Sequence, residues 1–295
     1  MKIGLLFANA GPFSQPEILA HLATTAEKVG VESLWTVEHV VIPQGYQSPY
    51  PYSKDGKIPG GEDVPIPDPL IPLGYVAAIT KKIKLATGVV ILPQRHPVYV
   101  AKEVATIDLL SGGRVILGIG SGWLKEEFDA LGLDFKTRGA RTDESIQAIR
   151  ALWSEGASAF HGKHFNFGPA MSFPKPVQAG GIPIHIGGHS PAAARRAGWL
   201  GDGFFPVHGP RECRFDQGAR GYRHLARGDS ATWQRQGQAV GGSRKARQRG
   251  HRQTLSGDQS AVVQRIRPAC DGTAGGEVSH ESGNQFCGFG TIQPS

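Results

Sequence analysis

The sequence predicts an α/β protein built on a parallel sheet, and three observations lead to that fold class. Six short apolar runs, each suited to a strand buried on both faces, alternate with segments of helical spacing. Gly and Pro separate these segments. The six units end by residue 206 of a 295-residue chain. A doubly wound sheet and a TIM-type (β/α)8 barrel both fit, and the room left for two more units favours the barrel.

The first two strands frame a well-marked helix. Residues 3–8 are a short apolar run, and a Gly-Pro turn follows them. Apolar side chains then recur at helical spacing over residues 18–29, and Gly30 suits the helix C-terminus. Residues 33–37 form the second apolar run, so we expect a strand–helix–strand unit over the first 37 residues.

Two stretches interrupt the alternation. Residues 42–69 are rich in Pro, Gly and Tyr and show no period, which predicts a long loop of the kind that serves as a lid or binding segment. Residues 156–180 are expected to be a second irregular insertion. Around these insertions, the pattern predicts further strands at 83–92, 114–119, 183–186 and 203–206, and helices at 70–80, 100–110, within 123–155 and at 191–200.

Polar residues stand where the predicted strands end. Glu38 and His39 follow the second strand, beside the predicted lid. A histidine there can exchange a proton near neutral pH, so we name His39 and Glu38 as candidate catalytic residues, with a structural hydrogen-bonded histidine as the alternative. Arg95 and His96 are a weaker case of the same kind.

Two glycine-containing turns also follow strands. Gly187, Gly188, His189 and Ser190 precede Pro191, so Ser190 suits a helix N-cap and the free N–H groups suit a phosphate. A well-capped loop without a ligand is the alternative. The second turn is expected to form another backbone wall of the same site, and it comprises Gly120, Ser121 and Gly122. No Cys/His cluster has metal-ligand spacing, so we assign no metal site.

The composition changes at residue 209. Residues 1–208 hold 19 Lys and Arg against 18 Asp and Glu, a net charge of +1, so +6 of the total net charge of +7 belongs to residues 209–295. That segment is rich in Arg and Gly, poor in aliphatic residues, and contains all three cysteines. We expect it to be disordered or out of frame, and we favour a shifted reading frame because disordered tails seldom carry scattered Cys and Trp.

Taken together, the motifs of residues 1 to about 208 resemble the luciferase-like monooxygenase superfamily, and within it the oxidoreductases that depend on coenzyme F420. The resemblance rests on Glu38 with His39, on the segment 87–123, and on the turn at residues 187–190. It implies a (β/α)8 barrel, usually dimeric, that carries a tricyclic ring at the carboxyl ends of its strands. Strands seven and eight have no recognisable counterpart in this chain, which would leave two sheet edges open. We therefore expect a poorly soluble or partly molten chain.

The resemblance also assigns roles. It implies that Thr87, Gly88 and Val89 support the ring, with a non-proline cis peptide between Gly88 and Val89, and that both glycine turns bind the cofactor phosphate and side chain. Two departures stand out: Glu38 replaces the usual Asp, and Trp123 stands where the sugar dehydrogenases of the family have a glutamate. Glucose-phosphate chemistry is therefore not expected.

The functional expectation is hydride transfer between F420 and a small organic substrate. One alternative is a monooxygenase that uses O2 and reduced FMN from a partner flavin reductase, and another is an inactive remnant that only binds cofactor. No apolar stretch is long enough for a membrane span and no signal peptide is seen, so we expect a cytoplasmic protein without a membrane partner. Without a basic stripe interleaved with aromatics, nucleic acid is not expected as a partner. A complete barrel would be a homodimer.

Overall fold

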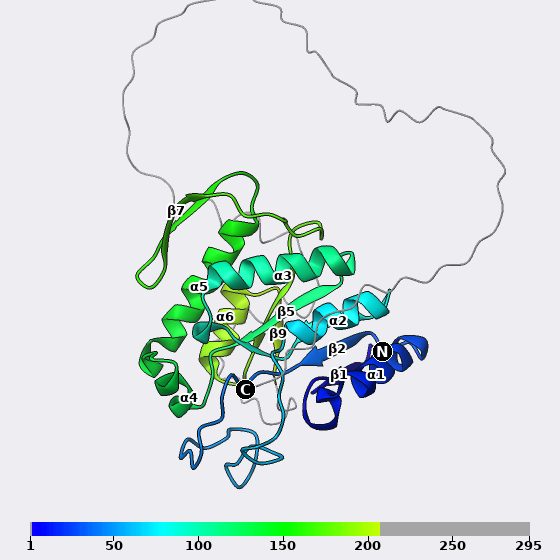
Figure 1. The fold of residues 1–295 in the computed structure, drawn as a ribbon. Helices are drawn as coiled ribbons and strands as arrows, with labels where there is room; N and C mark the ends of the chain where they lie inside the picture. The colour runs from blue at the N-terminus through cyan, green and yellow to red at the C-terminus, as the bar shows by residue number, and fades with distance from the viewer. Residues whose placement is uncertain (1, 207–295) are drawn as a thin grey trace, which may run out of the picture. The chain divides into compact units, whose positions relative to one another are not determined.

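A computed structural model of the protein describes residues 2–206 (Figure 1). The predicted atypical segment 209–295 lies outside the described residues, as do the expected last two strands. Among residues 2–206, no helix combines the length and the apolar character needed to cross a bilayer.

The described strands form one parallel sheet with the chain order expected of consecutive strand–helix units. Strand β4 (Val90–Ile91) continues the course of β3 and pairs with β5. The other strands follow one another along the sheet in the order β1 (Gly4–Leu6), β2 (Ser33–Thr36), β3 (Lys84–Thr87), β5 (Val115–Gly120), β8 (Ile184–Gly187) and β9 (Gly203–Phe205).

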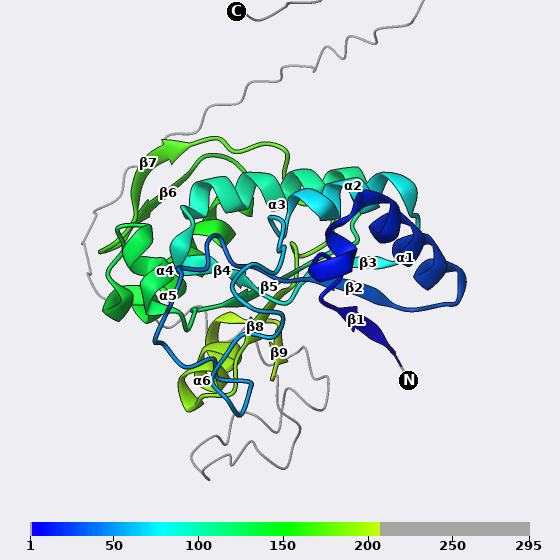
Figure 2. The ribbon, with the colours of Figure 1, turned by 60° about the horizontal axis from the view of Figure 1, so that its bottom comes forward.

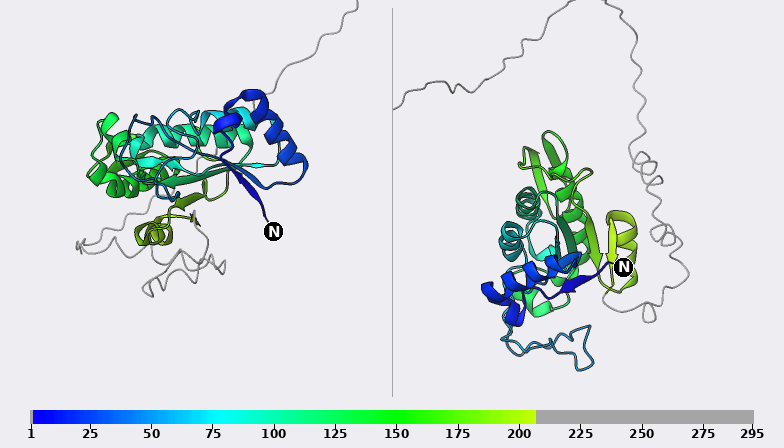
Figure 3. Two further views of the ribbon diagram at one scale, coloured as in Figure 1. Left: turned by 90° about the horizontal axis from the view of Figure 1, so that it is seen from below. Right: turned by 90° about the vertical axis from the view of Figure 1, so that its right-hand side faces the viewer.

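This sheet is curled into a half-barrel (Figure 3). Trp35 of β2 and Phe205 of β9 stack with ring centroids 4.9 Å apart and planes 8° from parallel. Strands β3, β5 and β8 separate β2 from β9 in the sheet. The two rings can meet only across the concave face, so the predicted barrel architecture is confirmed for the described strands.

Helices cover the convex face, and all except the shortest one pack against one another in chain order (Figure 2). The amphipathic spacing of the sequence explains this layer, because one side of each of these longer helices buries aliphatic residues in the core. The helices are α1 (Pro16–Lys28), α2 (Ile71–Ile79), α3 (Pro97–Ser111), the short α4 (Lys125–Ala130), α5 (Arg138–Trp153) and α6 (Pro191–Leu200). Single turns of 3-10 helix lie at η1 (Gly11–Ser14), η2 (Leu92–Gln94) and η3 (Phe135–Thr137).

The structure adds detail to two segments of the sequence prediction, the strand expected at 83–92 and the insertion expected at 156–180. The single strand expected at 83–92 is divided into β3 and β4, and the expected cis peptide between Gly88 and Val89 is present at the division. The irregular insertion expected at 156–180 is wrong in part, because it contains an antiparallel hairpin of β6 (Ser158–His161) and β7 (Asn166–Ala170). Both hairpin strands are too short for the alternation of apolar residues to stand out.

Glycines shape the concave face around Val89. A Cβ built on Gly120 would lie 2.6 Å from Val89 Cγ2, and a Cβ on Gly187 would lie 2.5 Å from Val89 Cγ1. Gly118 has no room either, because its Cβ would collide with the Thr87 carbonyl oxygen. Val89 is partly accessible between these glycines, so its side chain forms the floor of the concave face at the carboxyl ends of the strands.

We predict that Gly120→Ala destabilises the protein by about 1–3 kcal/mol, because the new methyl group overpacks against Val89. Val89→Ala should recover part of this loss, since it removes the clashing methyls, so the double variant should be more stable than the sum of the single changes implies. Gly198→Ala is the matched control: it lies in α6 with no atom within 4 Å of its built Cβ, and should be neutral or slightly stabilising. Urea unfolding measures all four variants, and strict additivity would contradict the packing argument.

Candidate active site

Residues that follow different strands meet at the carboxyl end of the half-barrel. Glu38 and His39 follow β2, Arg95 follows β4 and η2, Trp123 follows β5, and His189 follows β8. Parallel strands direct these loops to the same end of the sheet, which is where barrel enzymes place their chemistry. The long loop of residues 42–69 also contacts this end, through bonds to α4 and ring contacts to Trp123 and His189.

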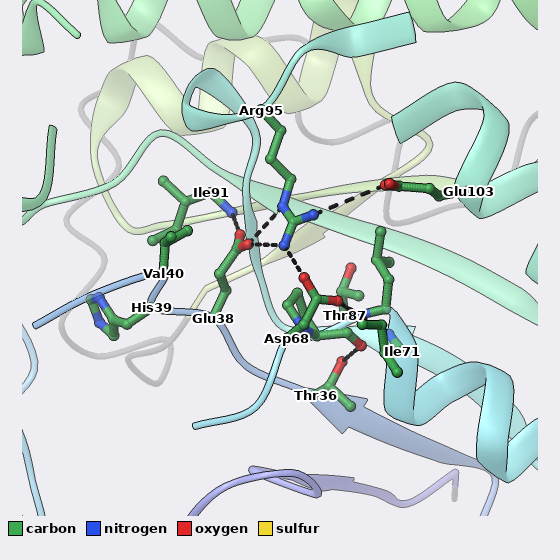
Figure 4. A network of polar contacts seen from close by, with 12 residues as sticks. Thr36, Glu38, His39, Val40, Asp68, Ile71, Thr87, Ile91, Arg95 and Glu103 are labelled. Carbon is green, nitrogen blue, oxygen red and sulfur yellow. Dashed lines mark hydrogen bonds and ion pairs between the residues drawn. The ribbon is translucent and has the colours of Figure 1, made fainter. Parts of the chain in front are cut away.

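Arg95 is the centre of a partly buried polar network (Figure 4). Its Nε donates to Glu38 Oε1 at 2.7 Å, and its Nη2 pairs with Asp68 Oδ2 at 2.5 Å. Glu103 lies 4.0 Å from Nη1. The second oxygen of Glu38 accepts the backbone N–H of Ile91. The network thus connects the end of β2, the segment before α2, β4 and helix α3.

The carboxyl groups of this network differ in their electrostatic surroundings. Burial raises the pKa of Glu38, while Arg95 and the Ile91 N–H act in the opposite direction. Burial also acts to raise the pKa of Asp68, but hydrogen bonds from Arg95 and from the N–H groups of Leu70 and Ile71 outweigh it, so that pKa is lowered. The charge of Arg95 is therefore committed to carboxylates and is not offered to a ligand.

Glu38 and His39 do not act on each other. Their side chains point in opposite directions, with Glu38 toward Arg95 (Figure 4). The carboxylate next to His39 is Glu127 of α4, whose Oε2 lies 3.1 Å from His39 Nδ1. The structure thus places the two candidate residues in different contacts, His39 beside Glu127 and Glu38 beside Arg95. Adjacent residues on an extended backbone project to opposite sides, which accounts for the split.

Glu126 and Glu127, neighbours at the start of α4, hold the lid loop by its backbone. Glu127 Oε1 accepts from Val40 N at 2.6 Å, and Glu126 Oε1 accepts from Gln47 N at 2.8 Å and from Ser48 N at 3.1 Å. Burial acts to raise the pKa of Glu126, but the hydrogen bonds from Ser48 and Gln47 lower it to about 2. These contacts replace the regular hydrogen bonding that the loop lacks.

Aromatic rings form a continuous row across the same end. Trp123 meets His39 edge-on at 5.6 Å and Tyr50 at 5.2 Å. Tyr50 then contacts Tyr52, which contacts His189 at 5.5 Å. Burial raises the pKa of both tyrosines. The row runs from the proposed proton-exchanging histidine to the predicted phosphate turn, so it forms one wall of the candidate site.

Sequence reasoning missed Glu127, Tyr50 and Tyr52. The two tyrosines stand in a stretch without a period, and Glu127 is one of two adjacent acidic residues in a short helix. Nothing in the local sequence indicates that Glu127, and not its neighbour Glu126, is the buried residue that contacts His39. The available signal was only the density of Tyr and Pro in the 42–69 loop, which indicated a lid without saying which residues would contact the site.

The predicted cofactor residues have definite local roles. Thr87 is buried and donates its hydroxyl hydrogen to Gly118 O at 2.6 Å. The hydroxyl of Ser121 faces α5 and α6, 3.2 Å from Thr142 Oγ1 and 3.4 Å from Arg196 Nη1. Ser190 caps α6 as expected, with its Oγ accepting from Ala193 N at 3.1 Å.

The glycines divide by role. Gly122 and Gly188 have positive φ angles of 78° and 118° and make turns, whereas Gly88, Gly120 and Gly187 adjoin Val89 on the floor. Among residues 2–206, no three His, Cys, Asp or Glu side chains are grouped so as to hold a metal ion.

The chain belongs to the luciferase-like monooxygenase family, whose model matches residues 5–228. This match agrees with the fold and with the arrangement of the strand ends. It also continues past the described residues and past residue 208, where the composition changes.

The similar proteins whose names state an activity are of two kinds, F420-dependent enzymes and monooxygenases. An F420-dependent glucose-6-phosphate dehydrogenase of Amycolatopsis mediterranei is 34% identical over 71% of this chain and 58% of its own length. The coenzyme F420-dependent tetrahydromethanopterin reductase of Methanopyrus kandleri is 27% identical, with a TM-score of 0.53 over 70% of this chain and 55% of that chain. The monooxygenase RslO1 of Streptomyces bottropensis is 29% identical, with a TM-score of 0.53 over 67% of this chain and 57% of that chain.

The chain spans less than two thirds of the length of the curated relatives it matches. The matched region covers 65% of uncharacterized mycobacterial proteins that are 34% identical, and 58% of the dehydrogenase.

We predict that Glu38→Gln destabilises the protein by about 3–5 kcal/mol, because it removes one partner of a buried ion pair and leaves Arg95 undercompensated. Asp129→Asn is the matched control, since Asp129 pairs with Lys125 on the surface and should cost less than about 1 kcal/mol. Chemical denaturation measures both variants, and equal losses would show that the Arg95 network does not anchor this end of the sheet.

The hydrogen bonds by which Glu126 holds Gln47 and Ser48 of the lid should persist in acid. Because its pKa is lowered from 4.5 to about 2, the stability that it contributes is fully present above pH 4.5 and is lost as the pH falls through about 2. The amide proton shifts of Gln47 and Ser48 should follow this titration in NMR spectra. Glu126→Gln should abolish the titration, and a midpoint near 4.5 in the native protein would contradict the assigned contacts.

Proposed function

We propose that the protein is an oxidoreductase that transfers hydride between coenzyme F420 and a small organic substrate. The observation that carries this proposal is the imidazole of His39, held by Glu127 at the carboxyl end of β2 and flanked by Trp123. The resemblance of the motifs to F420-dependent enzymes, and relatives that use F420, support the choice of cofactor.

The residues present fit a flat ring system with a phosphate. The half-buried side chain of Val89 makes a narrow apolar floor that Gly120 and Gly187 leave open, and any side chain at those two positions would occupy the floor. At the same end, α6 begins after Gly188 and Ser190, where a helix N-terminus favours an anion. We propose that these residues hold the cofactor, which when bound supplies the hydride donor or acceptor.

His39 would act as the proton partner. When an alcohol carbon loses its hydride, the hydroxyl proton moves to His39; in the reverse direction, His39 returns the proton to the carbonyl oxygen as the carbon gains hydride. The aromatic row of Trp123, Tyr50 and Tyr52 would exclude water from this exchange. Because Arg95 is held by Glu38 and Asp68, the described residues around His39 suit an uncharged substrate better than a sugar phosphate.

A second candidate is a monooxygenase that uses reduced FMN and O2, with a flavin reductase as partner. The relationship to RslO1, a monooxygenase, favours it. A third candidate is a remnant that binds cofactor without turnover, and the change of composition at residue 209 supports it. Anaerobic spectral titration of the full chain with F420 and with FMN separates the first two candidates, because the chromophores absorb at different wavelengths. Binding of FMN alone would overturn the F420 proposal.

With the bound cofactor and a panel of small alcohols and ketones, His39→Ala should lower kcat by about 100-fold or more, because general acid–base catalysis contributes about that much. Cofactor Kd should stay within a factor of a few. His21→Ala, an exposed histidine of α1, is the control and should not change kcat. Full turnover by the His39 variant would refute its role, and no turnover by the native chain under any condition would favour the remnant.

A further inference from the structure

Glu127 is an unusual buried acid. Its side chain is fully inaccessible, and within residues 2–206 it forms no ion pair with a lysine or arginine. Its contacts are the N–H groups of Val40 at 2.6 Å and Val41 at 3.4 Å, both on Oε1, and the ring of His39 on Oε2. A buried carboxylate persists only where such donors compensate for lost hydration. The backbone N–H groups on Oε1 and the ring nitrogen beside Oε2 make Glu127 an acceptor on both oxygens.

The geometry decides which nitrogen of His39 carries the proton. Oε1 is engaged by two backbone donors, so Oε2 is left to meet Nδ1 at 3.1 Å. An imidazole nitrogen is more basic than a carboxylate oxygen, so a proton shared between them resides on Nδ1. The neutral ring is then protonated at Nδ1, and Nε2 keeps its lone pair.

We propose that Glu127 is a positioning residue, which holds His39 in the Nδ1–H tautomer so that Nε2 is the atom that exchanges a proton with substrate. This inference rests on the proposed function of His39. Glu127 also holds the backbone of the two residues after His39, and Trp123 packs edge-on against the ring, so rotation of the ring is restricted as well as its protonation.

The isosteric variant Glu127→Gln tests this directly. The N–H groups of Val40 and Val41 require an acceptor, so they orient the amide oxygen of the new glutamine toward themselves. Its NH2 group must then face Nδ1 of His39 and donate to it. Nδ1 can accept only if the proton has moved to Nε2, so the variant should invert the tautomer without changing the shape of the side chain.

Nitrogen-15 NMR of histidine-labelled full-length protein, without cofactor or substrate and at a pH where the ring is neutral, reads the tautomer. Of the 11 histidines, His39 is assigned by the resonances missing from His39→Ala. The native protein should show a protonated Nδ1 and an unprotonated Nε2, and Glu127→Gln should show the reverse. Glu126→Gln is the matched control: it holds the lid through Gln47 and Ser48 without touching His39, so the native tautomer should remain.

Turnover supplies the second readout. Glu127→Gln should lower kcat at least tenfold, since Nε2 then presents a hydrogen where a lone pair is needed, while cofactor Kd changes little. An Nε2–H tautomer in the native protein, or an unchanged tautomer in Glu127→Gln, overturns the inference whatever the turnover is. Should Glu127→Gln fail to fold, the native spectrum alone still decides. If the tautomers behave as stated but His39→Ala keeps full turnover, the proposed function fails while the assignment of the Nδ1 proton stands.

Discussion

One guanidinium, that of Arg95, organises the functional end of this half-barrel. It joins Glu38 at the end of β2 to Asp68 before α2, and Glu38 in turn accepts from Ile91 of β4. A buried ion pair adds little net stability, because desolvation offsets the attraction, but loss of one partner is costly. The main effect of the ion pair is therefore geometric. It fixes the backbone at Glu38, and the next residue, His39, projects from that backbone into the site.

The irregular lid is held in the way that Glu38 holds Ile91: a carboxylate accepts hydrogen bonds from backbone N–H groups. Glu126 and Glu127 are adjacent in α4, yet they serve two different points of the lid, one near Ser48 and one directly after His39. A loop rich in Pro and Gly has few hydrogen bonds of its own, so external acceptors decide its course. The aromatic row then closes the space between this anchored loop and the α6 turn.

The glycines at the strand ends have a packing role in addition to the binding role inferred from the sequence. Gly120 and Gly187 stand in turns that predict phosphate binding, but what they meet in the structure is the side chain of Val89. Their lack of a Cβ makes room for an apolar floor, which is a packing requirement. Gly188 differs, because its φ angle of 118° is a backbone conformation that side chains disfavour.

The sequence by itself determined the order of strands and helices, the Ser190 cap and the position of His39 at a strand end, because these follow from local periodicity and turn chemistry. It could not distinguish Glu127 from Glu126, or reveal that Glu38 faces Arg95. Those facts depend on which side chains meet across separations of up to 88 residues, as between His39 and Glu127. Only the tertiary structure decided them, because the curl of the sheet and the anchoring of the lid bring together groups whose local sequences carry no sign of the contact.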